Sequence, residues 1–288
     1  MNILVTGGTG TTGSRVATQL RAEGAEVRVA SRKPQGFGQI RFDWTEPDTH
    51  AAALTGVDGC YLVPPIGAID PAPLVAPFLA AAVRAGVRRV VLLGSSAITA
   101  ETPGVGELYG LVRGAVPEWA VLRPSWFMQN FTGAHPVAAG IREAGEIVTA
   151  TGSGRVAFVD ADDIAAVAVR ALLDPVPHNT EHVLTGPEAL SYSAAAAVIA
   201  EVTGRAVRHR SVGRIEFAAL VNESGVPAEF AAMLADLDDG IRHGAEDRVT
   251  TVVPDVTGRV ARSFREHVVR HRAALSSEAV RPQGSSLR

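Results

Sequence analysis

The chain has 288 residues, of which 47% are hydrophobic and 20% are charged, and its formal net charge is −3. This composition suits a large buried core and lacks the basic excess that is typical of proteins binding nucleic acid or membrane surfaces. The single cysteine, Cys60, excludes an intramolecular disulfide.

The first part of the chain alternates apolar runs with helical patterns. The apolar runs do not alternate with polar residues, which is typical of strands covered on both faces. We predict strands at 2–6, 26–31, 59–64, 89–95 and 119–124, and helices at 13–23, 48–55, 72–85 and 105–115. This order predicts an α/β fold with a Rossmann-type, doubly wound parallel sheet. We assign residues 1–125 to a nucleotide-binding core.

The pattern loosens after Pro124 and predicts a smaller α+β lobe. The expected elements are two short strands around Gly152 and Gly154, a helix from about Asp162, a strand at 181–187, a helix at 191–204, a strand at 206–212, two helical pieces within 215–243, and a helix opened by the capping-box spacing of Ser263 and Glu266. We assign residues 126–275 to a substrate-binding lobe interleaved with the core, and residues 276–288 to a disordered tail.

The loop between the first strand and the first helix carries the glycine spacing Gly7-x-x-Gly10-x-x-Gly13. Gly7 permits a tight turn, Gly10 lets the backbone approach a pyrophosphate, and Gly13 lets the helix pack closely on the strand. The helix N-terminus then faces the phosphates. Three hydroxyls of this loop can add hydrogen bonds: Thr9, Thr11 and Thr12. The pattern, in its strand–loop–helix context, predicts a dinucleotide site.

The end of the second strand predicts which dinucleotide is bound. An acidic residue there would bind the ribose hydroxyls of NAD, but the strand ends in Ser31, Arg32 and Lys33. A guanidinium that holds a 2′-phosphate contributes roughly 1.5–3 kcal/mol, which corresponds to about a tenfold to hundredfold preference for NADP. We therefore predict NADP(H) bound at Arg32 and Lys33; the alternative is that both are solvated loop charges. Asp43 and Trp44 should lie near the adenine, although Asp43 could simply cap a turn.

A catalytic pair is harder to find. Short-chain dehydrogenases usually carry Tyr-x-x-x-Lys, in which the lysine lowers the pKa of a proton-donating tyrosine. Tyr109 is the candidate proton donor here, with Arg113 at the lysine position as a cation that could lower its pKa; the two could equally be a surface pair. Ser95 and Ser96, after the fourth predicted strand, could polarise a substrate, line the nicotinamide pocket or bond the local backbone.

The chain predicts no metal site. His267 and His271 have a possible ligand spacing, but no acidic or sulfur ligand joins them, so we expect an exposed helical face there.

Several stretches together resemble the NmrA-like atypical short-chain dehydrogenase/reductases over residues 1 to about 275. They are TGGTGTTG, YLVPPIG, RRVVLLGSSA, WAVLRPSWFMQNF, GRVAFVDADDIAAVAVRAL and HVLTGPEALSYSAAAAVIAEVTGR. Within that group, YLVPP and VLRPSWFMQNF look most like the ergot-alkaloid biosynthesis reductases, which include festuclavine synthase and agroclavine dehydrogenase and reduce an iminium with NADPH. The resemblance implies a nucleotide-binding sheet with a C-terminal substrate lobe.

The resemblance also implies further site residues. It adds cofactor contacts at Val63, Pro64 and Gly94, beside Ser95 and Ser96. It places four residues at the substrate beside the nicotinamide: Trp126, Phe127, Met128 and Asn130. Core packing is the alternative for Trp126 and Phe127. Asp163 matches a family motif, and we expect it to cap the following helix.

These observations predict an NADPH-dependent reductase of a small organic electrophile, namely an iminium, an activated alkene or a quinone, in secondary metabolism. Loss of Tyr-x-x-x-Lys fits an iminium, because its reduction gives a neutral amine and needs no acid. The alternative is an NADP(H)-binding redox sensor without turnover. A nucleotide-sugar epimerase would normally need the Tyr/Lys pair.

Location and assembly follow from composition. No apolar stretch reaches the roughly 20 residues of a membrane-spanning helix, and Met1 and Asn2 lead directly into the apolar run ILVTG. We therefore expect a cytoplasmic monomer or homodimer that has small-molecule substrates and no nucleic-acid or membrane partner.

Overall fold

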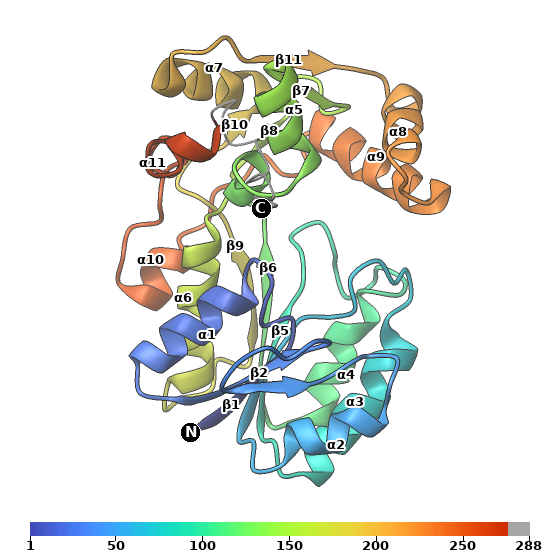
Figure 1. Cartoon of the computed structure of the whole chain (residues 1–288), viewed down its shortest axis with the longest axis vertical. Coiled ribbons are helices and arrows are strands. Elements are labelled where there is room, and N and C mark those ends of the chain that lie inside the picture. Colours follow the sequence, from blue (N-terminus) through green and yellow to red (C-terminus); the bar gives the residue numbers. More distant parts are fainter. Residues whose placement is uncertain (276–288) are drawn as a thin grey trace, which may run out of the picture. The chain divides into compact units, whose positions relative to one another are not determined.

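The computed structural model describes residues 1–275, so the tail predicted at 276–288 lies outside the described residues. The chain divides into two compact units (Figure 1). Unit 1 contains residues 1–125, 161–185 and 250–261, and unit 2 contains residues 126–160, 186–249 and the described chain from 262. The segment predicted as the lobe, 126–275, is therefore divided between the two units. No helix within residues 1–275 is long and apolar enough to cross a membrane.

Unit 1 is built on a seven-stranded sheet in the order β3-β2-β1-β4-β5-β6-β9, and every pair of neighbours is parallel. Its strands are β1 (Asn2–Val5), β2 (Glu26–Ser31), β3 (Gln39–Arg41), β4 (Gly59–Leu62), β5 (Arg89–Leu93), β6 (Glu118–Pro124) and β9 (Thr180–Leu184). The predicted Rossmann-type sheet is thus confirmed. From β1 the sheet is extended toward one edge by β2 and β3 and then toward the other edge by β4, so the topological switch point lies between β1 and β4. Open α/β sheets bind their ligands at such a point.

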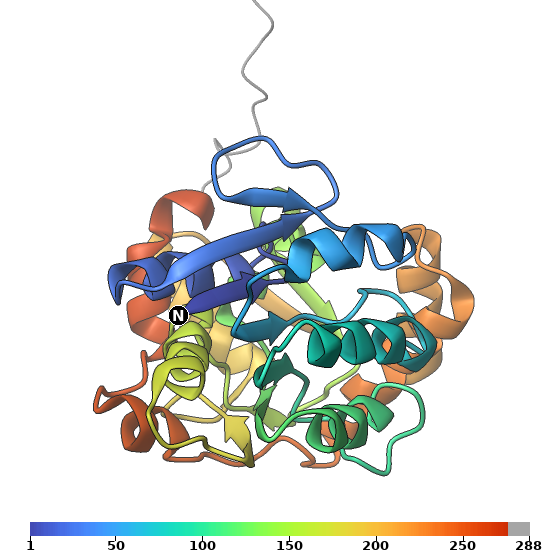
Figure 2. The same ribbon diagram turned by 90° about the horizontal axis from the view of Figure 1, so that it is seen from below.

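Helices cover both faces of this sheet (Figures 1 and 2). One face carries α1 (Gly13–Ala22) and α6 (Ala161–Leu173), and the other carries α2 (Asp48–Leu54), α3 (Ala72–Arg84) and α4 (Glu107–Ala115). All four residues of β4 are buried, which explains why its sequence shows no polar alternation. The strand predicted at 181–187 forms β9, which pairs with β6 at the edge of the core sheet. The short helix α10 (Val252–Thr257) packs on α6.

Unit 2 mixes short strands with longer helices. Strand β7 (Glu146–Thr149) pairs with β11 (Arg208–Ser211) in parallel, and β8 (Arg155–Val156) pairs with β10 (Leu190–Ser191) in antiparallel. Its helical segments are η1 (Met128–Phe131), α5 (Pro136–Ala144), α7 (Tyr192–Thr203), α8 (Arg214–Glu223), α9 (Ala228–Arg242), α11 (Phe264–Arg270) and η2 (Arg272–Leu275). The predicted break between two helices is found at Gly225, where φ is +96°.

A buried carboxylate ties together distant parts of unit 2. Asp160 is fully buried, and its Oδ2 lies 2.7 Å from Nη1 of Arg262 and 2.8 Å from Nδ1 of His267. Gln129 Nε2 donates to Asp160 Oδ1 at 3.2 Å. Nε2 of His267 lies 3.0 Å from Oγ1 of Thr132. These contacts join η1, the end of the 155–160 segment and α11.

The environment of His267 corrects one expectation. The sequence predicted an exposed face for His267 and His271, but the His267 side chain is fully buried. The predicted capping box of α11 is present, with Ser263 Oγ accepting from the Glu266 N–H and Glu266 Oε2 accepting from the Ser263 N–H. In the helix that this box opens, His267 faces Asp160.

We expect Asp160→Asn to lower the free energy of unfolding by roughly 2–4 kcal/mol, because it leaves the guanidinium of Arg262 without its buried counter-charge. Chemical denaturation measures the change. Glu201→Gln is the matched control, because Glu201 pairs with Arg265 on the solvent-exposed surface. That variant should unfold like the wild type. Equal stability of the two variants would contradict a structural role for Asp160.

Candidate cofactor and substrate sites

The glycine corner has the sterics that a dinucleotide loop needs. Gly7 adopts a left-handed conformation with φ of +58°, and a Cβ there would lie 2.9 Å from Cβ of Val63. A Cβ on Gly13 would lie 2.3 Å from the carbonyl oxygen of Gly7. Helix α1 therefore starts directly against the turn that ends β1. These are the tight turn and the close helix packing predicted for these two glycines.

Gly10 has a different environment from its neighbours. A Cβ there would meet only the carbonyl oxygen of Gly7, at 3.2 Å, and the residue is exposed. Apart from this one tight backbone contact, nothing lies within 4 Å of that Cβ position, which leaves room for the approach of a pyrophosphate. Gly8 was missed by the sequence reasoning: a Cβ there would lie 2.5 Å from Cγ1 of Val29. The consecutive glycines 7 and 8 were the signal that could have found it.

The start of α1 favours an anion. No acidic residue occupies its first turn, so the positive end of the helix dipole is uncompensated there. Thr9 and Thr11 are exposed beside Gly10, whereas Thr12 is only 4% exposed and makes no side-chain cap bond. Thr9 and Thr11 are therefore available to a phosphate, and the contact predicted for Thr12 stays a prediction.

The residues predicted for the adenosine end lie close together. Arg32 and Lys33 are exposed directly after β2. Asp43 Oδ1 accepts from N and Oγ1 of Thr45 at 2.9 and 2.8 Å. These two hydrogen bonds lower the pKa of Asp43, and the charges of Arg32 and Arg41 lower it further. Asp43 therefore does cap a turn, and it does so within electrostatic reach of Arg32.

Trp44 and Val63 lie at the edges of the predicted cofactor site. Trp44 is half-buried, with its ring centroid 5.0 Å from that of Phe42 and 5.2 Å from that of Phe78, so at least part of the ring serves packing. Val63 and Pro64 follow β4 and are half-buried. The N–H of Val63 donates to Oγ1 of Thr6 at 2.7 Å, which holds the end of β4 beside the end of β1.

Tyr109 is held at the end of β5. Its side chain is 2% exposed, and its hydroxyl lies 3.3 Å from N and 3.4 Å from O of Ser95. A Cβ on Gly94 would lie 2.3 Å from that hydroxyl, so glycine makes room for it. Arg123 donates from Nε to the carbonyl oxygen of Ser95 at 3.4 Å and from Nη2 to that of the buried Ser96 at 3.3 Å. The phenol thus anchors the loop that carries both serines.

The electrostatics of Tyr109 differ from the expectation. Arg113 is exposed, and the cation near the tyrosine is Arg123, whose guanidinium carbon lies 5.9 Å from the ring centroid. Burial raises the pKa of Tyr109, and this effect exceeds the opposing effects of the Ser95 backbone and the Arg123 charge. The idea that Arg113 lowers this pKa is therefore wrong. The role of Tyr109 as a proton donor stays a prediction.

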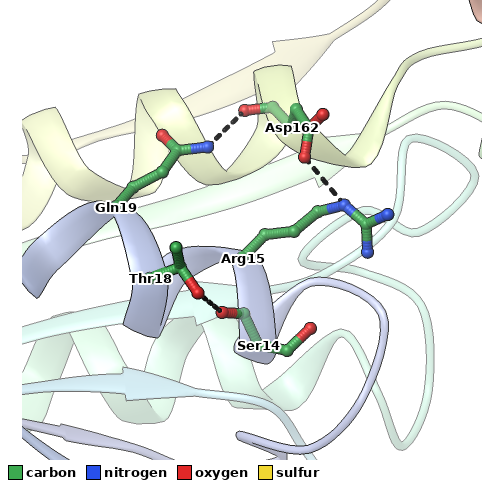
Figure 3. A pocket seen from close by; sticks show the side chains of 5 residues that line it. All are labelled: Ser14, Arg15, Thr18, Gln19 and Asp162. Carbon is green, nitrogen blue, oxygen red and sulfur yellow. Dashed lines mark hydrogen bonds and ion pairs between the residues drawn. The ribbon is translucent and has the colours of Figure 1, made fainter. Parts of the chain in front are cut away.

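A groove of about 370 Å³ lies between α1 and α6 (Figure 3). Arg15 Nε lies 2.8 Å from Oδ1 of Asp162, and Gln19 Nε2 donates to the carbonyl oxygen of Asp162 at 3.1 Å. These bonds fix the start of α6 against the dinucleotide-loop helix. Asp163 lies in the first turn of α6, two residues after its start at Ala161, rather than at the capping position predicted for it.

Unit 2 encloses a second cavity, also of about 370 Å³. Trp126 and Asn130, both predicted to contact the substrate, line it. Met128 does not line it; it is 1% exposed and packs in the core of unit 2. Phe127 forms a bridge with Val159 and is also absent from the lining. The structure thus brings two of the four predicted residues to this cavity.

The sequence reasoning missed the polar residues of this cavity other than Asn130, and two of them are buried and titratable. Asp238 on α9 is 7% exposed, and Tyr192 at the start of α7 is 5% exposed. Burial raises the pKa of Asp238 to about 6, and burial together with the Asp238 charge raises that of Tyr192. Asp238 stands in the acidic stretch DLDD, which resembles a solvated helix face, so no local signal marked it.

Comparisons with known proteins agree with this geometry. A family model described as NAD(P)H-binding matches residues 7–175. The uncharacterized oxidoreductase YesF of Bacillus subtilis is 48% identical over 96% of this chain and 96% of that protein. Agroclavine dehydrogenase of Claviceps fusiformis is 38% identical over 93% of this chain and 96% of that protein. The structure of an NADPH-dependent quinone oxidoreductase of Escherichia coli in complex with NADPH has a TM-score of 0.79 at 24% identity, covering 93% of this chain and 99% of that one, and shows the shared fold.

The sheet, its switch point and the glycine corner define a dinucleotide-binding protein of the Rossmann type. The chain belongs to the NAD(P)H-binding family, and its relatives place it among the oxidoreductases. The resemblance to the ergot-alkaloid reductases that the sequence indicated is confirmed by the agroclavine dehydrogenase.

We expect Gly10→Ala to weaken NADPH binding by about tenfold or more, because the new methyl group enters the space where the pyrophosphate must approach. The unfolding midpoint should fall only slightly, because the Cβ meets a single atom, the carbonyl oxygen of Gly7, at 3.2 Å. Fluorescence titration and thermal denaturation measure the two effects. Gly110→Ala on α4 is the control: a Cβ there meets no atom within 4 Å. It should bind NADPH normally. Unchanged affinity in Gly10→Ala would place the pyrophosphate elsewhere.

Proposed function

We propose that this protein is an NADPH-dependent reductase that transfers a hydride to a small organic electrophile: an iminium, an activated alkene or a quinone. The observation that carries the proposal is the largely apolar cavity of unit 2, lined by Trp126 and Asn130, in a chain whose other unit has a dinucleotide loop. A protein that only sensed the cofactor would not need such a cavity. The resemblance to ergot-alkaloid reductases supports a role in secondary metabolism.

The chain's own residues bind and orient the reactants. NADPH, when bound, supplies the hydride. The backbone around Gly10 and the N-terminus of α1 would hold its pyrophosphate, and Arg32 with Lys33 would hold the 2′-phosphate. The apolar cavity would exclude water and orient the substrate. An iminium becomes a neutral amine, so its reduction needs no acid from the protein. Tyr109 is the candidate donor for an electrophile that does need one.

The alternative is a redox sensor that binds NADP(H) without turnover, and a substrate panel separates the two functions. We expect the loss of NADPH absorbance to require both protein and substrate when imines, quinones and enals are tested in turn. Gly10→Ala should slow the reaction at low NADPH concentration, whereas Gly110→Ala should not. Tight NADPH binding without turnover on the whole panel would favour the sensor.

The preference for NADPH is tested by Arg32→Ala. Removing the guanidinium should weaken NADPH binding by about tenfold to a hundredfold, because the charge-assisted bonds to the 2′-phosphate are lost, and should change NADH binding little. Arg41→Ala is the matched control, because Arg41 is exposed nearby and already pairs with Glu46 at 2.8 Å. Equal losses for NADPH and NADH in Arg32→Ala would show that another residue holds the phosphate.

A further inference from the structure

The cavity of unit 2 contains a carboxylate that the proposed function does not use. Oδ2 of Asp238 accepts a hydrogen bond from the N–H of Ala150 at 2.8 Å. Within residues 1–275, Oδ1 has no hydrogen-bond partner and the carboxylate has no ion-pair partner. The nearest cation along α9 is Arg242, but its Nε and Nη2 donate to the carbonyl oxygens of Ala150 and Val212 at 2.8 and 2.7 Å. Arg242 therefore influences Asp238 only through space.

The other charges of the cavity are balanced among themselves. Oε1 and Oε2 of Glu146 lie 2.9 Å from Arg208 and 3.2 Å from Arg210, and Arg210 also reaches Glu216 at 3.0 Å. The charge without a partner in the lining is thus that of Asp238. Burying such a charge is costly unless a counter-charge joins it.

The walls around Asp238 are apolar and partly aromatic. Trp126, Tyr192 and Phe217 contribute rings, and aliphatic residues complete the lining: Val137, Val148, Leu220, Val221, Val226, Leu234 and Leu237. The electron-rich faces of aromatic rings attract cations. An unpaired carboxylate among such rings is the arrangement that recognises a positively charged nitrogen carried on an apolar body.

We propose that Asp238 is the anionic anchor of this cavity and selects organic cations, that is, ligands that join a positively charged nitrogen to an apolar body. As a statement about the substrate, this inference rests on the proposed function. It ranks the iminium first among the candidate electrophiles, because an iminium is cationic whereas a quinone and an enal are neutral. Asp238 would act by binding and orienting the substrate, with no bond made or broken at the carboxylate.

The test uses two ligands of the same shape that differ in charge: para-(hydroxymethyl)phenyltrimethylammonium and para-tert-butylbenzyl alcohol. Calorimetry on the full chain should show the wild type binding the cation about tenfold or more tightly than the neutral ligand. Asp238→Asn keeps the size of the side chain and an acceptor for the Ala150 N–H, and it should lose this preference while still binding the neutral ligand. Asp239→Asn, which changes the adjacent carboxylate outside the cavity, should keep it.

A pH series on the wild type tests the same idea without a variant, so it holds even if Asp238→Asn does not fold. The ammonium is permanently charged, so any pH dependence belongs to the protein. Because the pKa of Asp238 is about 6, its carboxylate is ionised above that pH and is neutralised as the pH falls through it. Affinity for the cation should therefore fall below pH 6, while affinity for the alcohol should stay constant.

Other groups around the cavity must be separated from Asp238 in that series. The titratable and charged residues around it are His135, Glu146, Tyr192, Arg210 and Arg242, with His209 behind the lining, where its Nε2 lies 2.8 Å from Oγ1 of Thr149. Burial raises the pKa of Tyr192 and lowers that of His135, so the pH series is repeated on a variant that lacks the imidazole. His135→Asn should leave the pH profile unchanged, whereas Asp238→Asn should flatten it.

Two results would overturn the inference: equal affinity of the wild type for the two ligands, or a preference for the cation that survives in Asp238→Asn. Neither depends on turnover. If the protein prefers the cation but oxidises no NADPH, the proposed function fails and the inference stands. If it reduces quinones but binds the two ligands equally, the inference fails and the proposed function stands.

Discussion

Helix α1 begins so close to the turn after β1 that no side chain fits between them, and the rest of unit 1 depends on this contact. The carbonyl oxygen of Gly7 occupies the space that a Cβ of Gly13 would need. The close approach puts the helix N-terminus over the switch point between β1 and β4, where the strand order reverses. The same helix contacts the start of α6 through Arg15 and Gln19. The backbone atoms that fix this packing therefore belong to the loop that we propose to hold the pyrophosphate.

The sheet was predictable because its signals are local. Strands such as β4 are buried on both faces and show as unbroken apolar runs, and the capping box of α11 is a contact between residues three apart. Helices α5 and α10 were missed. Helix α5 is as long as the predicted α4, but it is opened by His135, an unusual cap, followed by Pro136, so the usual start signal is lacking. Helix α10 spans only six residues, which are too few to show an apolar stripe.

The candidate sites show the same difference between local and long-range signals. The glycine corner and the Arg32 loop are contiguous in sequence, so residue types and spacing were enough to indicate them. The environments of Asp238 and His267 depend on segments far apart in the chain: Asp238 meets Ala150, and His267 meets Asp160. A carboxylate in DLDD and a histidine on a terminal helix resemble solvated surface groups until tertiary packing encloses them. Arg113 is an error of the opposite kind, in which a local pattern suggested a contact that the fold does not make. Helical spacing indicated Arg113 as the cation beside Tyr109, but that cation is Arg123 of β6.

The path of the chain between the units limits how this protein can be cut or recombined. Unit 1 takes its edge strand β9 and its helix α6 from residues 161–185, after the chain has already entered unit 2, and takes α10 from residues 250–261. A fragment ending at residue 125 would leave the β6 edge bare and would remove α6 from its contact with α1. Grafting a foreign substrate lobe would accordingly require splicing at five junctions, not one, and gene fragments encoding either half alone make poor starting points for engineering.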